Sequence, residues 1–141
     1  LGLYLAALFA LWMLTAHWIY ALTVGPEMPA SFSAFLRDVA TTPEGWTMAI
    51  AGTLVGACFA LAALAASVVS FPMLLDRNVS VPVAVATSAR LLRRNPRVVL
   101  SWGALIAVML ALGAIPMLLG LVVVLPVLGH ASWHLYRRAV V

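Results

Sequence analysis

The sequence predicts an all-α membrane protein, a polytopic transmembrane helical bundle with four spans and interfacial amphipathic helices. Three observations predict it. Of the 141 residues, 65% are hydrophobic and only 9% are charged, whereas soluble domains carry roughly 25% charged residues. The mean hydropathy is +1.13. Long charge-free intervals alternate with short charged segments. This large number of apolar side chains requires lipid or membrane-embedded protein around it. We therefore expect a single transmembrane domain over residues 1–141.

The charge-free intervals predict the number of spans. They cover residues 1–26, 45–75 and 98–136, and a spanning helix needs about 20 residues. The first two intervals hold one span each. The third has 39 residues, about 58 Å as one helix and nearly twice the hydrocarbon thickness. It must fold back, and Gly113–Pro116 is the natural break. The expected spans are about 1–24, 46–74, 98–114 and 117–136.

The first span begins without a charged flank. Leu1 already lies in an apolar stretch, and 26 uncharged residues precede Glu27. This length suits a spanning helix better than the short apolar core of a signal peptide. We therefore expect that the chain lacks an N-terminal portion.

Arginine placement predicts the orientation. The segment Asp76–Arg97 holds five arginines and one acid, whereas Glu27–Glu44 holds one arginine and three acids. Because positive residues accumulate on the cytoplasmic side of a membrane, the basic loop 76–97 and the tail with Arg137 and Arg138 are expected on the cytoplasmic side. Four spans place both ends of the chain in the cytoplasm, whereas three would separate the two basic ends.

The outer loop, residues 25–45, is expected to contain a short interfacial helix. Phe32, Phe35, Leu36 and Val39 recur at helical spacing, as in helices that lie at a membrane surface. The next span starts at Thr42-Pro43-Glu44, because threonine can cap a helix, proline suits its first position and glutamate complements its dipole.

The inner loop 76–97 predicts a basic amphipathic helix that Asn95-Pro96 ends. Its arginines cluster on one side, and the opposite side is mostly apolar. The basic residues are Arg90, Arg93, Arg94 and Arg97, and the other face has Val81, Val85, Ser88 and Leu92. One interpretation is docking to a partner or to acidic membrane lipids; the other is an interfacial helix that only sets topology.

Small residues on the second span form a predicted helix-packing face. Gly52, Gly56 and Ala60 follow one another at four-residue spacing, which lets another helix approach closely. That helix can belong to this chain or to another. Cys58 is the single cysteine and is expected to be a packing residue, since one cysteine forms neither an internal disulfide nor a cysteine metal site.

Two histidines are weak cofactor-binding candidates. His130 and His134 are one helical turn apart on the last span, a spacing that would let both ligate a metal or haem. No carboxylate or cysteine accompanies them, so structural hydrogen bonding is preferred, with proton handling as a third alternative. His130 lies deeper, and Pro126 four residues earlier frees a carbonyl.

Other classes of function find little support in the residues. No nucleophile-and-base pair, phosphate loop or paired carboxylates are present, so we expect no enzyme, no catalytic residue, no metal and no cofactor. The spans contain no Asp, Glu, Lys or Arg, which weakens coupled transport. The net charge of +4 comes from arginines beside the spans, which argues for topology and lipid rather than nucleic acid.

Three segments carry a resemblance to a known family: Phe71–Arg77, Asn95-Pro96 and Leu125–Arg137. With them the chain resembles an uncharacterised bacterial membrane family, domain-of-unknown-function family 2189, clearly over residues 45–141 and more loosely in the first span. Members resemble six-span inner-membrane proteins, and some are labelled as cytochrome c oxidase subunits. The resemblance implies electron transport, through an accessory subunit or assembly factor that joins other integral membrane subunits. A small-solute transporter or channel ranks second, and a haem- or metal-handling protein third.

Overall fold

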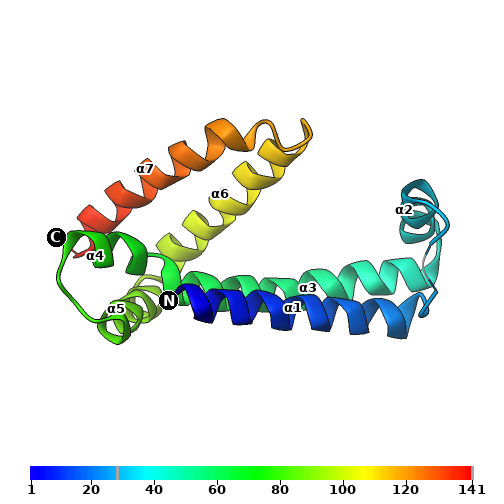
Figure 1. Cartoon of the computed structure of the whole chain (residues 1–141), viewed down its shortest axis with the longest axis horizontal. Helices are drawn as coiled ribbons and strands as arrows, with labels where there is room; N and C mark the ends of the chain where they lie inside the picture. The colour runs from blue at the N-terminus through cyan, green and yellow to red at the C-terminus, as the bar shows by residue number, and fades with distance from the viewer. Residues whose placement is uncertain (28, 141) are drawn as a thin grey trace. The chain divides into compact units, whose positions relative to one another are not determined.

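The computed structural model describes residues 1–27 and 29–140 and is all-α, with no strand among them (Figure 1). The expected fold class is confirmed. The chain divides into two compact units, Leu1–Ala63 and Leu64–Val141, and the boundary falls inside helix α3. The expected outer loop includes Met28, which lies outside the described residues.

The first unit contains α1 (Gly2–Thr23), α2 (Phe32–Thr41) and most of α3 (Pro43–Ser67). Helices α1 and α3 run side by side (Figure 1). The short helix expected in the outer loop is confirmed as α2, where the Ser31 hydroxyl accepts a hydrogen bond from the Ala34 amide at 3.1 Å. The first amide groups of a helix have no acceptor within the helix, and the Ser31 hydroxyl supplies an acceptor for one of them.

A tight corner joins α2 to α3, and Thr42 caps α3 there as expected. The Thr42 hydroxyl accepts a hydrogen bond from the Gly45 amide at 3.0 Å and donates one to the Asp38 carbonyl at 2.7 Å. Gly45 is buried, and a Cβ at this position would come within 2.5 Å of the Val39 Cα. Only glycine allows the two helices to approach this closely.

The expected second span, 46–74, is not one continuous helix. Helix α3 ends at Ser67 and α4 (Ser70–Asp76) follows, because Val69 has a ψ of −4° outside the helical range. Pro72 explains the break: it has no N–H for the Val68 carbonyl, and its ring crowds that carbonyl. With 25 residues, α3 alone is about 38 Å long and can cross the hydrocarbon layer.

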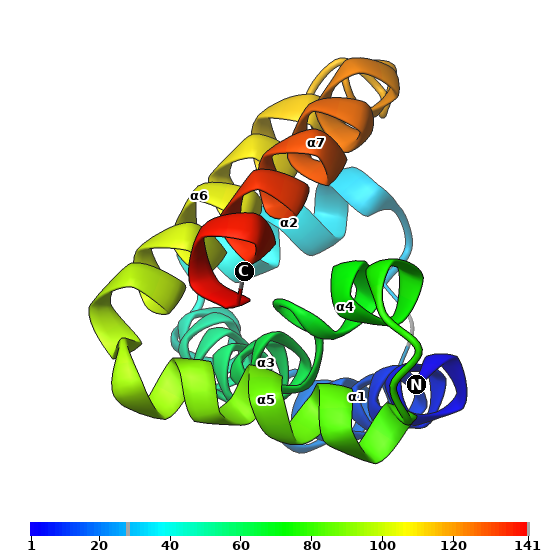
Figure 2. The same ribbon diagram turned by 90° about the vertical axis from the view of Figure 1, so that its left-hand side faces the viewer.

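The second unit contains α4, α5 (Val81–Arg94), α6 (Pro96–Ala114) and α7 (Leu121–Val140). Helices α6 and α7 form an antiparallel hairpin, and α4 and α5 pack near the end where α6 begins and α7 ends (Figures 1 and 2). The buried core lies at that end and comprises Val68, Val69, Met73, Ala84, Val99 and Tyr136.

The hairpin turn occupies residues 115–120. Helix α6 ends at Ala114, at the expected break, but α7 begins at Leu121 rather than at 117. Met117 and Leu118 have positive φ values of 48° and 68°, a backbone conformation that non-glycine residues rarely adopt. The turn therefore uses residues that were expected to begin the last span.

Three stretches of the described residues are long and apolar enough to cross a membrane: Gly2–Thr23, Pro43–Asp76 and Pro96–Ala114. They match the first three expected spans in place. Helix α7 follows α6 as an antiparallel partner, and the fourth crossing by α7 stays a prediction.

The basic helix expected in the inner loop is confirmed as α5, which ends at Arg94 with Asn95 as its C-cap. Its apolar face packs against the core of the second unit, with Ala84 and Ser88 completely buried and Leu91 and Leu92 beside them. Val81, expected on this face, is 40% exposed. The packing partners of α5 are therefore helices of its own chain.

Ser88 supplies a stability prediction. Its buried Oγ has no hydrogen-bond partner among the described residues, and an unpartnered buried hydroxyl is destabilising. We expect Ser88→Ala to raise the free energy of unfolding by about 1 kcal/mol. Ser70→Ala is the control, since the equally buried Ser70 hydroxyl donates to the Ala66 carbonyl at 2.5 Å; it should lower stability. Denaturation in detergent micelles measures both, and a destabilised Ser88→Ala would contradict the expectation.

Candidate functional site

An apolar groove lies between α1 and α3 in the first unit, with a volume of about 560 Å³. Its walls are large apolar side chains, and small residues of α3 lie between them. The lining residues are Leu5, Leu8, Phe9, Trp12, Gly56, Phe59, Ala60 and Ala63. Concave apolar sites of this size hold ligands or partner side chains.

The predicted packing face lies partly in this groove. Gly56 faces α1, since a Cβ there would lie 3.4 Å from the Trp12 Nε1, whereas a Cβ at Gly52 would meet nothing within 4 Å. Ala60 lines the groove and is exposed. The helix that approaches Gly56 is therefore α1 of the same chain, while Gly52 has open space beside it.

The rim of the groove on α1 was not predicted. Leu5, Leu8 and Phe9 lie on a helix whose side chains are apolar on all sides, so no periodicity distinguishes the face that turns toward α3. The four-residue spacing of Gly52, Gly56 and Ala60 was the one signal for a site in this unit.

The structure places His130 and His134 on exposed parts of α7. The His130 Nδ1 lies 2.9 Å from the Pro126 carbonyl oxygen. Because a carbonyl oxygen only accepts, this bond requires the proton on Nδ1. His130 thus finds a polar partner on its own helix, one turn away. Among residues 1–27 and 29–140, no three His, Cys, Asp or Glu side chains are grouped to hold a metal ion.

A partly buried hydrogen bond links α7 to α4, and the sequence analysis did not predict it. The Tyr136 hydroxyl donates to the Asp76 Oδ2 at 2.7 Å, and Tyr136 is completely buried. The Arg77 Nε lies 3.9 Å from the same oxygen, the one ion pair of the described chain. Sixty positions separate the two partners, so no local pattern brings them together.

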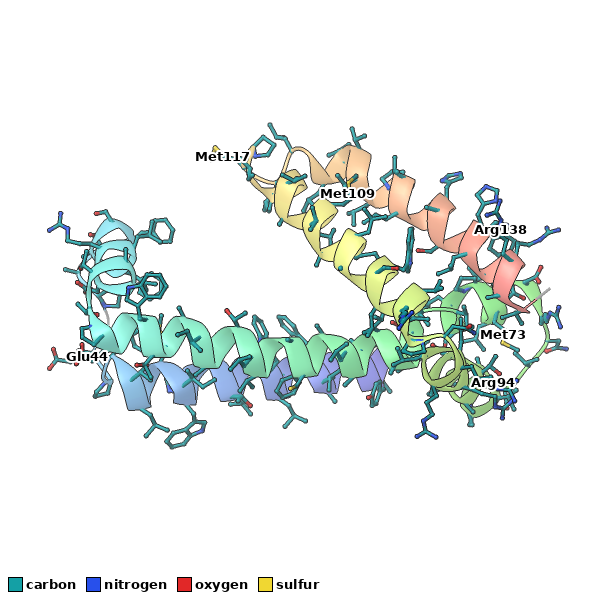
Figure 3. All side chains as sticks on the ribbon, turned by 180° about the vertical axis from the view of Figure 1, so that it is seen from behind. Glu44, Met73, Arg94, Met109, Met117 and Arg138 are labelled. Carbon is teal, nitrogen blue, oxygen red and sulfur yellow. The ribbon has the colours of Figure 1, made fainter. Side chains whose placement is uncertain are left out.

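Six arginines gather at one end of the α6–α7 hairpin. Arg97 begins α6 and Arg137 and Arg138 belong to the last turn of α7, so they lie opposite the turn that holds Met117 (Figure 3). Arg90, Arg93 and Arg94 end the adjoining α5, and all these arginines are exposed. This end can bind anionic groups.

One protein-family model matches the chain, over residues 1–76, and its description reads "Predicted integral membrane protein (DUF2189)". The match includes the first span, expected to resemble the family loosely, and ends with α4 at Asp76. It does not reach Leu125–Arg137. No curated protein and no solved structure matches the chain.

Proposed function

Because the chain belongs to the integral membrane protein family DUF2189, whose model matches more than half of it, we propose that it is a non-catalytic accessory subunit or assembly factor of a membrane complex. The groove of the first unit carries this proposal. A groove flanked by two spanning helices opens toward the membrane, where another protein's helix can reach it.

A transmembrane helix of another subunit fits the groove chemically. Helices associate in lipid through close van der Waals packing, which small residues permit. Gly56 and Ala60 lie in the groove one turn apart, and the space beside Gly52 continues the same line. Phe9, Trp12 and Phe59 around them supply large surfaces for a partner's side chains.

The respiratory or other energy-transducing complex is the second part of the proposal. It rests on the resemblance of the sequence to a family in which some members are labelled as cytochrome c oxidase subunits. Spans without Asp, Glu, Lys or Arg disfavour the alternative of coupled transport, because coupled transporters place such groups near mid-membrane. We also place the chain in the bacterial inner membrane with both ends cytoplasmic, since five arginines of 76–97 favour that side.

Affinity purification of the full-length protein in mild detergent tests the accessory role, with mass spectrometry of the co-eluting chains. We expect integral subunits of an energy-transducing complex in stoichiometric amounts. Ala60→Leu fills the groove and should reduce their recovery at least about fivefold, a loss of roughly 1 kcal/mol.

Ala57→Leu is the matched control. Ala57 is also an exposed alanine of α3, but it does not line the groove, so the same added volume should leave the partners in place. If the wild-type protein elutes alone, the accessory role is wrong. If Ala57→Leu and Ala60→Leu lose partners equally, the groove is not the contact.

A further inference from the structure

A polar cavity lies between the end of α5 and the end of α7 in the second unit, with a volume of about 320 Å³. Three of its lining residues, Arg90, Arg94 and Asn95, have side-chain N–H groups that can donate hydrogen bonds. The hydroxyl of Thr87, which also lines the cavity, already donates to the Val83 carbonyl at 2.8 Å. Leu91, Ala139 and Val140 complete its walls. Two guanidinium groups and one amide group at the same cavity suit the oxygen atoms of a phosphate.

The positive charge of the cavity has no counter-charge within the described chain. Arg90 and Arg94 are one helical turn apart, and neither has a carboxylate partner. Like charges at this spacing destabilise a helix. Asn95 precedes α6 without capping it, and the first turn of α6 has no acidic residue, so the positive end of that helix dipole also favours an anion here.

A second cavity of about 430 Å³, lined mainly by apolar side chains and here called the apolar cavity, adjoins the polar one. The two share Leu91, Asn95 and Ala139. The second cavity extends along the start of α6 and the end of α7, where its further lining residues are Val98, Val99, Leu135 and Arg138. A polar compartment continuous with an apolar one matches an amphiphile better than a soluble anion.

The depth at which these cavities lie in the membrane also favours an amphiphile as the ligand. Helix α6 is a candidate span that begins at Pro96, and its 19 residues measure about 28 Å, the thickness of the hydrocarbon layer. Asn95 therefore lies at headgroup level. Lipid phosphates occupy that level, and basic pockets between helices there bind anionic headgroups.

The geometry points to a binding site for one anionic phospholipid. Its phosphate lies between Arg90 and Arg94, with a hydrogen bond from the Asn95 amide, and an acyl chain follows the apolar cavity past Val98 and Leu135. The site is independent of the groove between α1 and α3, because all of its residues belong to the second unit.

Titration of the purified full-length protein with phosphatidylglycerol, followed by native mass spectrometry, tests the site. We expect one tightly bound lipid per chain and weak binding of phosphatidylcholine. The double variant Arg90→Gln/Arg94→Gln should bind phosphatidylglycerol about 30-fold more weakly, the loss that two arginines near a membrane surface would cause. Unchanged thermal unfolding would show that the variant is folded.

The control is Arg93→Gln/Arg137→Gln, which also removes two positive charges. One of these arginines is on α5 and the other on α7, and neither lines the cavity. It should bind within about twofold of the wild type. An equal loss in both double variants would overturn the site in favour of nonspecific attraction. Inorganic phosphate at millimolar concentration should not displace the lipid, and full displacement would overturn the role of the apolar cavity.

Discussion

Replacing Tyr136 by alanine is expected to lower the free energy of unfolding by about 4 kcal/mol, the range measured when a large aromatic residue is removed from a core. Tyr136 is completely buried. Its ring lies 5.6 Å from that of Trp133, and its hydroxyl donates to Asp76 at 2.7 Å. The substitution removes the ring, opens a cavity and takes a hydrogen bond from a carboxylate. Equilibrium unfolding in mixed detergent micelles, followed by circular dichroism, measures the loss.

Two further variants separate the causes. Tyr136→Phe keeps the ring and loses only the bond to the Asp76 carboxylate, so it should cost about 2 kcal/mol. Leu125→Ala, on an exposed part of the same helix, should cost about 0.5 kcal/mol or less. If Tyr136→Ala is no more destabilising than Leu125→Ala, then Tyr136 does not hold α7 against α4.

Gly120→Ala is expected to destabilise the α6–α7 hairpin by about 3 kcal/mol, a typical upper cost for overpacking. A Cβ at Gly120 would lie 2.8 Å from both the Cα and the carbonyl oxygen of Gly113. These are backbone atoms, so no side-chain rotation relieves the overlap. The two glycines therefore allow the chain to approach itself closely at the turn, and the added methyl group should push the helices apart.

Gly129→Ala is the matched control for this substitution. Gly129 lies within α7, and a Cβ there would meet nothing within 4 Å, so alanine should stabilise the helix by about 0.5 to 1 kcal/mol. Opposite signs for the two glycine-to-alanine changes, measured by thermal unfolding in detergent, are the expected result. A neutral Gly120→Ala would contradict the close approach at the turn.

Several helices were predictable because their signals are local. Charge-free intervals of sufficient length mark α1, α3 and α6, and the residues at the start of α3 are the cap, the first-position proline and the acid that a helix start favours. Helix α5 follows from its segregated faces and from the proline after Asn95. Each of these signals acts within a few positions along the chain.

The break between α3 and α4 carried a local signal that the apolar composition obscured. Pro72 removes the N–H that the Val68 carbonyl needs, which would have divided the expected span 46–74. The hairpin turn carried a weaker signal. Pro116 suits a helix start, but the positive φ values of Met117 and Leu118 come from the geometry of the turn and not from any preference of those residues.

The sequence identified the residues of the groove and of the polar cavity only in part. Gly56 and Ala60, which their spacing grouped as part of a packing face, both line the groove, but the opposing wall of α1 has no distinguishable face. Spacing alone also grouped Arg90, Arg93, Arg94 and Arg97, whereas only the first and third of them line the polar cavity. Which arginines share a cavity depends on where the end of α7 lies against α5, and that contact joins residues far apart in the chain.

The sequence by itself determined that this is a membrane protein built of helices, the approximate places of α1, α3, α5 and α6, and which end of the α6–α7 hairpin is basic. Hydropathy and charge act residue by residue against lipid and water, so composition along the chain is enough for that. Only the tertiary structure decided that α5 buries Ala84 and Ser88 in a core, that Tyr136 donates to Asp76, and that Gly113 meets Gly120. Spans in lipid are apolar on every side, so the choice of packing face depends on close contacts between distant residues, which periodicity does not encode.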